Sequence, residues 1–250
     1  MTSSLTPSDF PGFFQDLYGD APFPWQQALV ERLCSATTYD GAWPDTIDLP
    51  TGSGKTACLD AAVFALAAQA GREPAERTMP RRIVLCVDRR VVVNDAFIRA
   101  RELADRLRRD DASEVLRRVA ASLRRIASAA PEDGAVPLDA FEMRGGIYRD
   151  EQWARSATQP TIITTTVDQL GSRLLFRGYG VSPGSRPMYA GLLSHDTVIL
   201  LDEAHISNPF AETLQSIRRF TNDGRWASSG VGVPPLRVVT MTATPSTNSG

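Results

Sequence analysis

Short apolar runs of strand length recur along the chain and are separated by longer helical or polar stretches. They occupy residues 46–49, 82–88, 161–166, 197–202 and 237–242. β-Branched runs that alternate with helical segments indicate a parallel sheet that is buried on both faces. The pattern therefore predicts an α/β fold, with a mostly parallel, doubly wound sheet and helices on both faces.

Helical periodicity is clearest at residues 24–34, 55–70 and about 91–130. The first of these segments begins at a proline, which suits the first turn of a helix, and the second is rich in alanine. Residues 1–22 are polar with scattered Pro, Gly and Phe, and we expect them to be a leader that packs against the domain formed by residues 23–250.

Arginine and acidic side chains are interspersed along residues 91–130. A groove for nucleic acid and a solvated helical face would both account for the arginines. Opposite charges at helical spacing favour the solvated face, because they stabilise each other across successive turns. We therefore do not expect the active site in this segment.

Composition limits the possible functions. A formal net charge of −2 argues against binding of nucleic acid by bulk electrostatics, so any such contact must be local. The three cysteines have neither zinc-site nor disulfide spacing, which favours a reducing cytoplasm. The longest apolar run, residues 61–68, is too short for a membrane span, and the N-terminus lacks signal-peptide features. We expect a soluble cytoplasmic protein.

A glycine-rich loop between the first strand and the alanine-rich helix has the context of a phosphate-binding loop. Its residues are Pro50, Thr51, Gly52, Ser53, Gly54, Lys55 and Thr56. Glycines allow backbone N–H groups to face phosphate oxygens, and the helix N-terminus adds partial positive charge. The strict pattern asks for a glycine six residues before the lysine, where this chain has Leu49, followed by Pro50. The shorter form, which has only the glycines at 52 and 54 before Lys55, is typical of helicase-type motors. The alternative is a Gly/Ser turn without function.

Lys55 is the only lysine in the chain. All other basic side chains except histidine are arginine, whose broad planar fork cannot replace a compact ammonium inside a backbone cradle. Lys55 is therefore predicted to contact the β- and γ-phosphates of ATP, and Thr56 to ligate Mg²⁺ through its hydroxyl group.

The strand at residues 197–202 ends in two carboxylates, Asp202 and Glu203, followed by Ala204 and His205. Asp202 is predicted to hold Mg²⁺, and Glu203 to orient and deprotonate the attacking water. An acidic strand end that merely faces a helix N-terminus is the structural alternative.

The remaining polar motifs are weaker. His205 is predicted to couple the ATP site to its neighbours, and Thr242 and Thr244 to relay hydrogen bonds to a nucleic-acid track. His195 and Asp196 resemble a metal-nuclease dyad, but such a site needs more metal ligands than two histidines provide. His195 is therefore expected to be a turn residue.

These motifs, in this order, resemble those of superfamily-two helicases of the DEAH-type grouping, where they belong to the first of two RecA-like domains. The resemblance implies a RecA-like phosphate-loop NTPase domain with Gln26, or alternatively Gln27, reading the adenine. It also implies contacts to the nucleic-acid backbone. The matching residues are Arg89, Arg90, Arg144, Gly145, Thr165, Thr166, Asp168 and Gln169.

Longer strings at residues 87–90, 171–180 and 201–214 resemble the CRISPR-associated helicase/nuclease of type I interference (the Cas "three" family), in its type I-U or I-G branch. That resemblance implies action on single-stranded DNA displaced by a Cascade-type guide-RNA surveillance complex. It also implies a second RecA-like domain and a histidine-aspartate nuclease domain, and we expect neither of them within these 250 residues. Without the second domain we expect ATP binding with inefficient hydrolysis.

Two rival interpretations stay open. The first is another superfamily-two motor, such as a DNA-repair translocase or an RNA helicase. The second is an interaction module that binds ATP without driving movement.

Overall fold

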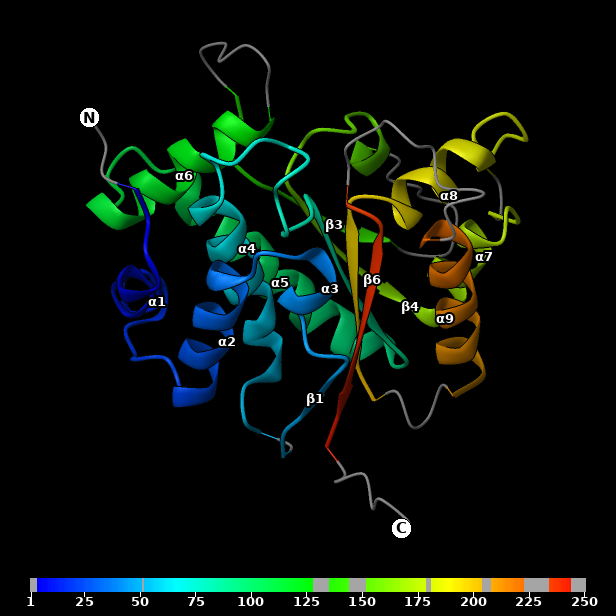
Figure 1. Cartoon of the computed structure of the whole chain (residues 1–250), viewed down its shortest axis with the longest axis horizontal. Coiled ribbons are helices and arrows are strands. Elements are labelled where there is room, and N and C mark those ends of the chain that lie inside the picture. Colours follow the sequence, from blue (N-terminus) through cyan, green and yellow to red (C-terminus); the bar gives the residue numbers. More distant parts are fainter. Residues whose placement is uncertain are drawn as a thin grey trace.

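A parallel six-stranded sheet lies at the centre of the computed structural model, which describes residues 4–50, 52–127, 135–143, 152–178, 181–203, 208–222 and 234–243 (Figure 1). The strands are β1 (Thr46–Asp48), β2 (Arg82–Val87), β3 (Asp139–Met143), β4 (Thr161–Thr166), β5 (Thr197–Leu201) and β6 (Leu236–Thr242). Their order is β1-β6-β5-β2-β4-β3, and every neighbouring pair is parallel.

Helices cover both faces of this sheet (Figure 1). One face carries α1 (Phe10–Tyr18), α2 (Pro24–Ser35), α4 (Cys58–Ala68), α5 (Arg90–Arg108) and α6 (Glu114–Ala127), and the other carries α7 (Val167–Leu174), α8 (Arg186–Ser194) and α9 (Asn208–Asn222). The short helix α3 (Tyr39–Ala42) precedes β1. The predicted α/β fold with a doubly wound sheet is confirmed.

Two apolar cores lie on opposite faces of the sheet. Along β2, the side chains of Ile83 and Leu85 join the core under α4 and α5, whereas Val84 and Cys86 join the core under α7 and α8. Successive side chains of a strand point to opposite faces, so a central strand must be apolar throughout. This requirement explains why the sequence signalled the central strands so clearly.

The edge strand β3 was not predicted. Residues 139–143 mix acidic and apolar side chains, and most of them are only half-buried. β3 has one strand neighbour, β4, and most of its side chains are partly exposed, so it need not be apolar throughout. The five strands that were predicted are all present, with ends that differ by at most one residue.

The arginine-rich stretch forms two helices, α5 and α6, rather than one continuous helical segment. The break falls at residues 109–113, where Arg109 and Asp111 form an exposed ion pair with 2.7 Å between Nη2 and Oδ2. Along α5, the exposed Asp105 lies 3.8 Å from both Arg101 and Arg108, which fits a solvated face with opposite charges at helical spacing. Arg108 and Arg118 also pair with other elements, with Asp139 of β3 at 2.9 Å and with Asp9 before α1 at 2.9 Å.

The N-terminal leader contains a helix that the sequence did not reveal. In α1, Phe10 and Phe13 are fully buried, and their rings lie 5.4 Å and 5.3 Å from that of Phe64 in α4. Pro11 and Gly12 obscured the helical pattern, although proline is tolerated in a first turn. The leader therefore belongs to the main core. Among the residues described, no helix is both long and apolar enough to span a membrane.

Replacing Phe13 with alanine is expected to lower the free energy of unfolding by about 3–5 kcal/mol, because it removes a buried ring and leaves a cavity. Urea denaturation would measure this change. The matched control is Phe220→Ala, since Phe220 is 67% exposed and its loss should change stability by about 0.5 kcal/mol or less. Equal effects of the two substitutions would contradict this account of the core.

Candidate nucleotide-binding site

The carboxyl ends of the strands bring the predicted motifs to one edge of the sheet. Asp48, at the end of β1, lies opposite Thr242 of β6, and the N–H of Leu49 donates to the carbonyl of Thr242 at 3.1 Å. Because β6 lies between β1 and β5, the phosphate loop and Asp202 start two strand spacings apart, roughly 10 Å. In open α/β sheets this edge is where ligands bind.

The phosphate loop depends on glycine at two positions. Gly52 and Gly54 have φ angles of 82° and 73°, in the left-handed region that side chains with a Cβ rarely adopt. At Gly54 a Cβ would also lie 3.3 Å from Nε2 of Gln26 and 3.4 Å from Cε2 of Phe23. Ser53 stabilises the turn by donating from Oγ to the carbonyl of Pro50 at 2.7 Å. Thr51 lies outside the described residues.

The first turn after the loop is tighter than predicted. Residues Lys55–Ala57 form a 3-10 turn, and the α-helix begins at Cys58. The left-handed Gly54 accepts a hydrogen bond from the N–H of Ala57 at 2.9 Å, which closes the tighter turn. N–H groups in the first turn of a helix lack intrahelical acceptors, so this end of α4 can donate to phosphate oxygens.

Lys55 is available for an anionic ligand. Its half-buried ammonium donates to the carbonyl of Leu49 at 3.3 Å and, among the described residues, pairs with no carboxylate. Burial and the carboxylates of Asp60 and Asp202 raise the pKa of Cys58 to about 12, and Lys55 acts in the opposite direction. Strand order, with β6 between β1 and β5, is what brings Lys55 and Asp202 to the same edge of the sheet.

The acidic motif leaves β5 in a strained turn. Glu203 has a φ of 49°, which costs a residue with a side chain about 1–2 kcal/mol, and its N–H donates to Oδ1 of Asp202 at 3.0 Å. Both side chains are half-buried. Non-glycine residues in this conformation gather at functional sites. His205 lies outside the described residues.

The residues at this edge fit magnesium and a nucleoside triphosphate. Thr56 and Asp202 offer a hydroxyl and a carboxylate, the hard oxygen ligands that Mg²⁺ prefers alongside phosphate and water. Lys55 and the first turn of α4 offer donors to phosphate oxygens, and Glu203 offers a base beside them. The assignment of these roles stays a prediction.

A pocket next to the phosphate loop lies between α1, α2, α5 and the 3-10 turn that precedes α4. It has a volume of about 490 Å³ and is lined by Phe14, Tyr18, Asp20, Ala21, Phe23, Gln26, Gly54, Ala57 and Arg99. A pocket that combines aromatic walls with a few polar groups is typical of small-molecule sites.

The geometry distinguishes between the two candidate glutamines. Gln26 lines this pocket and is 2% exposed, and its Oε1 accepts a hydrogen bond from the N–H of Phe23 at 2.9 Å. Gln27 instead donates to Pro7 and Glu31. The position of Gln26 fits the predicted adenine contact, whereas Gln27 is turned toward the N-terminal segment.

Several pocket residues were not predicted from the sequence. Tyr18 and Arg99 carry no recognisable motif and reach the pocket only through the packing of α1 and α5. Trp25 donates from Nε1 to the carbonyl of Ser53 at 3.0 Å, so the start of α2 is tied to the phosphate loop. In the sequence, the only indication of this role for Trp25 was its position immediately before Gln26.

The predicted nucleic-acid residues gather partly on neighbouring strand ends. Val87, the last residue of β2, lies opposite Thr166, the last residue of β4, and Arg89 lies two residues after Val87. Arg89 and Asp168 are exposed, and Gln169 accepts a hydrogen bond from Arg173 at 2.8 Å. The side chain of Arg90, and Arg144 and Gly145 altogether, lie outside the described residues.

Thr165 corrects one of these predictions. It is fully buried, and its hydroxyl faces the carbonyls of Met143 at 3.4 Å and Thr166 at 3.3 Å. Alternation along β4 places the side chains of Thr165 and Thr166 on opposite faces of the sheet, and that of Thr165 is covered. In this structure Thr165 cannot contact a nucleic-acid backbone directly.

The last strand links the two motifs of the nucleotide site. Thr242 is half-buried, and its backbone joins β1 immediately before the phosphate loop, while Leu201 of β5 lies opposite Thr240 of β6. A shift of β6 would therefore reach both motifs. Coupling through Thr242 stays a prediction, and Thr244 lies outside the described residues.

His195 and Asp196 lie at the opposite, amino-terminal end of β5. His195 caps α8, and its backbone bridges to Pro235. Asp196 is 2% exposed and accepts from Nη1 of Arg81 at 2.9 Å, with Nη2 of Arg77 at 3.5 Å. Asp196 therefore anchors two arginines at the base of the sheet.

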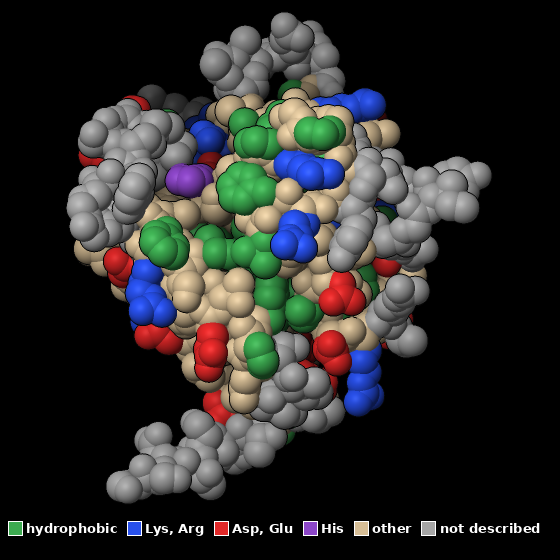
Figure 2. All heavy atoms as spheres, turned by 90° about the vertical axis from the view of Figure 1, so that its right-hand side faces the viewer, with side chains coloured by type: hydrophobic (Ala, Val, Ile, Leu, Met, Phe, Trp, Pro, Cys, Tyr) green, Lys and Arg blue, Asp and Glu red, His purple; other side chains and the backbone are tan. Residues whose placement is uncertain are grey.

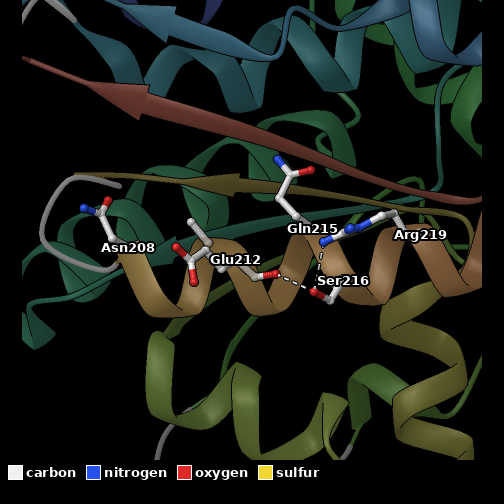
Figure 3. A pocket seen from close by; sticks show the side chains of 6 residues that line it. Asn208, Glu212, Gln215, Ser216 and Arg219 are labelled. Atoms are coloured by element: carbon white, nitrogen blue, oxygen red, sulfur yellow. Dashed lines mark hydrogen bonds between the residues drawn. The ribbon is translucent and has the colours of Figure 1, made fainter.

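A second hollow, of about 430 Å³, runs along α9 (Figure 3). Figure 3 shows Arg219 donating to Ser216, which donates in turn to the backbone of Glu212. Every side chain that lines it comes from α9, and none is a predicted site residue. This hollow therefore contributes nothing to the nucleotide site.

The fold and the motifs at its edge define a RecA-like domain of the superfamily-two helicase type. The chain belongs to the family described as "Type III restriction enzyme, res subunit", which matches residues 20–247. Its structure is similar to that of the yeast DEAD-box splicing factor Prp28, with a TM-score of 0.50 and 17% sequence identity, over 93% of this chain and 42% of that chain. At this identity the likeness shows the fold alone. No curated protein matches the sequence.

Proposed function

We propose that the chain is the nucleotide-binding domain of an ATP-dependent DNA translocase or helicase. The observation that carries this proposal is the convergence of the phosphate loop and the Asp202-Glu203 motif at one edge of the sheet, where they follow β1 and β5 on either side of β6. Lys55 and the first turn of α4 bind and orient the phosphates. Glu203 accepts the proton of the attacking water.

Magnesium, when bound with ATP, would neutralise charge on the phosphates. Thr56 and Asp202 hold it in the proposed site, Asp202 either directly or through water. Glu203 follows Asp202 in a left-handed turn, and its N–H donates to Oδ1 of Asp202 at 3.0 Å. Two carboxylates at one strand end suit a division of labour between a metal ligand and a base.

The nucleic-acid track is proposed to run past the ends of β2 and β4. Thr166 ends β4 opposite Val87 of β2, and Arg89 lies two residues after Val87. Arginine and threonine suit contacts to phosphate that do not read sequence. The net charge of −2 makes a few such local contacts more important, because the molecule as a whole does not attract DNA.

Replacing Arg89 with alanine is expected to weaken binding of single-stranded DNA about three- to tenfold and to reduce its salt dependence by about 0.7 in log–log slope. ATP binding should not change. Fluorescence anisotropy with a labelled oligonucleotide at several salt concentrations would measure both DNA quantities. Arg101→Ala, on the exposed part of α5 with a side chain 70% exposed, is the control. Equal losses of DNA and ATP binding would make Arg89 structural.

The finer proposal is a motor of CRISPR type I interference that acts on the DNA strand displaced by a Cascade-type surveillance complex. Its support is the resemblance of residues 171–180 and 201–214 to that family. Figure 2 shows apolar and arginine side chains exposed on the face of α7, α8 and α9. The exposed apolar residues there are Leu175, Phe176, Met188 and Phe220. Exposed apolar patches of this kind often mark protein interfaces.

ATP hydrolysis with and without single-stranded DNA tests the proposed function. The domain by itself should hydrolyse ATP slowly, because a second RecA-like domain would supply further catalytic groups. Single-stranded DNA should increase the rate of hydrolysis. Stimulation by RNA and not by DNA would favour another superfamily-two motor. Binding of ATP with no hydrolysis under either condition, even when a second RecA-like domain is supplied, would favour an interaction module.

A further inference from the structure

The helix α7 ends in a turn that ordinarily carries glycine. Phe176 has a φ of 59°, the left-handed conformation in which a Cβ crowds the following carbonyl oxygen. Its N–H donates to the carbonyl of Arg173 at 3.2 Å, and the N–H of Arg177 donates to the carbonyl of Ser172 at 2.7 Å. These two bonds define a Schellman motif, in which the left-handed residue is usually glycine. Phenylalanine at this position therefore costs the chain stability.

Packing within the chain does not offset this strain. Phe176 is 56% exposed, and the preceding Leu175 is 50% exposed. A Schellman motif is often closed by an apolar contact between two of its residues, but here those residues are the polar Arg177 and Ser172. On α8, which packs against α7, Met188 is 49% exposed. Large apolar side chains thus face solvent on two neighbouring helices.

The charge around these apolar side chains is positive. Between Asp168 and Asp196 the sequence contains no carboxylate side chain but has three arginines, Arg173, Arg177 and Arg186. Neither Arg177 nor Arg186 forms an ion pair with any residue that the structure describes. In a chain with a net charge of −2, this segment is a local concentration of positive charge, and it suits an acidic partner.

This surface lies away from the proposed nucleic-acid track. α7 starts directly after β4 and runs back from the carboxyl edge of the sheet, and α8 ends just before β5 begins. Figure 2 shows apolar and arginine side chains in the upper part of this face, above most of its acidic side chains. The upper part lies toward the end of the sheet at which the strands begin (Figure 1).

The apolar side chains favour a protein over nucleic acid. Phosphates and carboxylates would both pair with arginine, but bases bind mainly by stacking on aromatic rings. Of the three exposed apolar residues, only Phe176 is aromatic, whereas Leu175 and Met188 have flexible chains that pack against other apolar side chains. A protein segment with both acidic and apolar residues therefore fits this surface best.

We propose that the α7/α8 surface, formed by Leu175, Phe176, Arg177, Arg186 and Met188, docks an acidic segment of a partner protein. Apolar side chains of that segment pack on Leu175, Phe176 and Met188, and its carboxylates pair with the two arginines. The inference deepens the proposed function by naming the chemistry of a protein partner, and the assignment of that partner to a motor rests on the proposed function. Docking itself needs neither ATP nor DNA.

The test selects peptides from a random library displayed on phage, with the unaltered chain as target. The enriched peptides are then synthesised, and their binding is measured by fluorescence anisotropy. They are expected to be rich in acidic residues interspersed with apolar ones and to bind with a Kd of about 10–100 μM. No enrichment, or enrichment of peptides without acidic residues, would overturn the proposal.

The variant that tests the surface is Phe176→Gly with Arg177→Glu, and it is expected to raise the Kd of the enriched peptides at least about tenfold. The matched control is Ile98→Ser with Arg106→Glu, two exposed residues of α5 on the other face of the sheet. It should change the Kd by less than about twofold. Equal affinity of the variant and the unaltered chain would place the peptides elsewhere and overturn the proposal.

The single variant Phe176→Gly separates docking from stability. Glycine relieves the left-handed strain, so the Tm is expected to rise by about 2–4 °C. A fall of about 2 °C or more would show that the ring is held within the chain, and it would overturn the role of Phe176 as an anchor for a partner.

Two further measurements test the other occupants. Binding of labelled oligodeoxythymidylate that the double variant weakens about tenfold would assign the surface to nucleic acid. Self-association in sedimentation experiments that the same variant abolishes would assign it to a second copy of the chain. Either result overturns the proposal.

Binding of MgATP, measured by isothermal titration calorimetry, reports on the proposed function separately. Acidic peptides that bind in the absence of any MgATP binding would remove the motor and leave the docking surface in place. MgATP binding without acidic peptides would overturn the docking surface alone.

Discussion

Replacing Lys55 with alanine is expected to raise the Kd for MgATP about a hundredfold, measured by isothermal titration calorimetry. Lys55 is the only lysine in the chain, and its ammonium lies at the phosphate loop without a carboxylate partner among the described residues. A charge-assisted hydrogen bond to phosphate is worth about 1.5–3 kcal/mol, which is lost with the ammonium.

The fold of the Lys55→Ala variant should be intact, because the described contacts of Lys55 amount to one hydrogen bond to the backbone of Leu49. Thermal unfolding checks this point. Lys55→Arg provides a sharper comparison, since it keeps the charge but replaces a compact ammonium with a planar fork; it too should bind MgATP poorly. Tight binding by both variants would show that the nucleotide does not use this loop.

Replacing Glu203 with glutamine is expected to lower ATP hydrolysis about 10²- to 10⁴-fold and to change MgATP binding by less than about twofold. Glutamine keeps the size of the side chain and can still orient water, but it cannot accept the proton. Phosphate release under single-turnover conditions, followed over hours if needed and in the presence of single-stranded DNA, would measure the rate.

Glu212→Gln is the matched control, because Glu212 is an exposed carboxylate on α9 and its loss should leave hydrolysis unchanged. Undiminished turnover by the Glu203 variant would remove Glu203 from the role of base. A loss of MgATP binding in the same variant would instead assign Glu203 to the metal or to the strained turn that holds it.

The candidate nucleotide site is supported from two sides. β6 separates the phosphate loop from the acidic motif, and its pairing with β1 reaches Leu49 through the carbonyl of Thr242. The pocket next to the phosphate loop is fixed from the other side, because Tyr18 and Arg99, which line it, both bind the buried Asp60 of α4. A change at either support should therefore alter nucleotide binding. It should have little effect on the structure at the opposite end of the sheet, where Asp196 pairs with Arg81.

The sequence by itself determined the fold class and the main motifs, because both are written in local patterns. A strand buried on two faces must be apolar throughout, and a phosphate loop needs its glycines, lysine and hydroxyl in consecutive positions. It missed β3 and α1, whose signals are weakened by the mixed polarity of an edge strand and by Pro11 and Gly12.

Only the tertiary structure decided which distant residues meet. The strand order brings the phosphate loop near Asp202 across β6, and strand pairing puts Val87, two residues before Arg89, opposite Thr166. Alternation along β4 buries Thr165, which the sequence had assigned to nucleic acid. Tyr18, Asp60 and Arg99 meet through the packing of three helices. Contacts between residues far apart in the chain depend on the long-range arrangement of the sheet and helices, which no local pattern encodes.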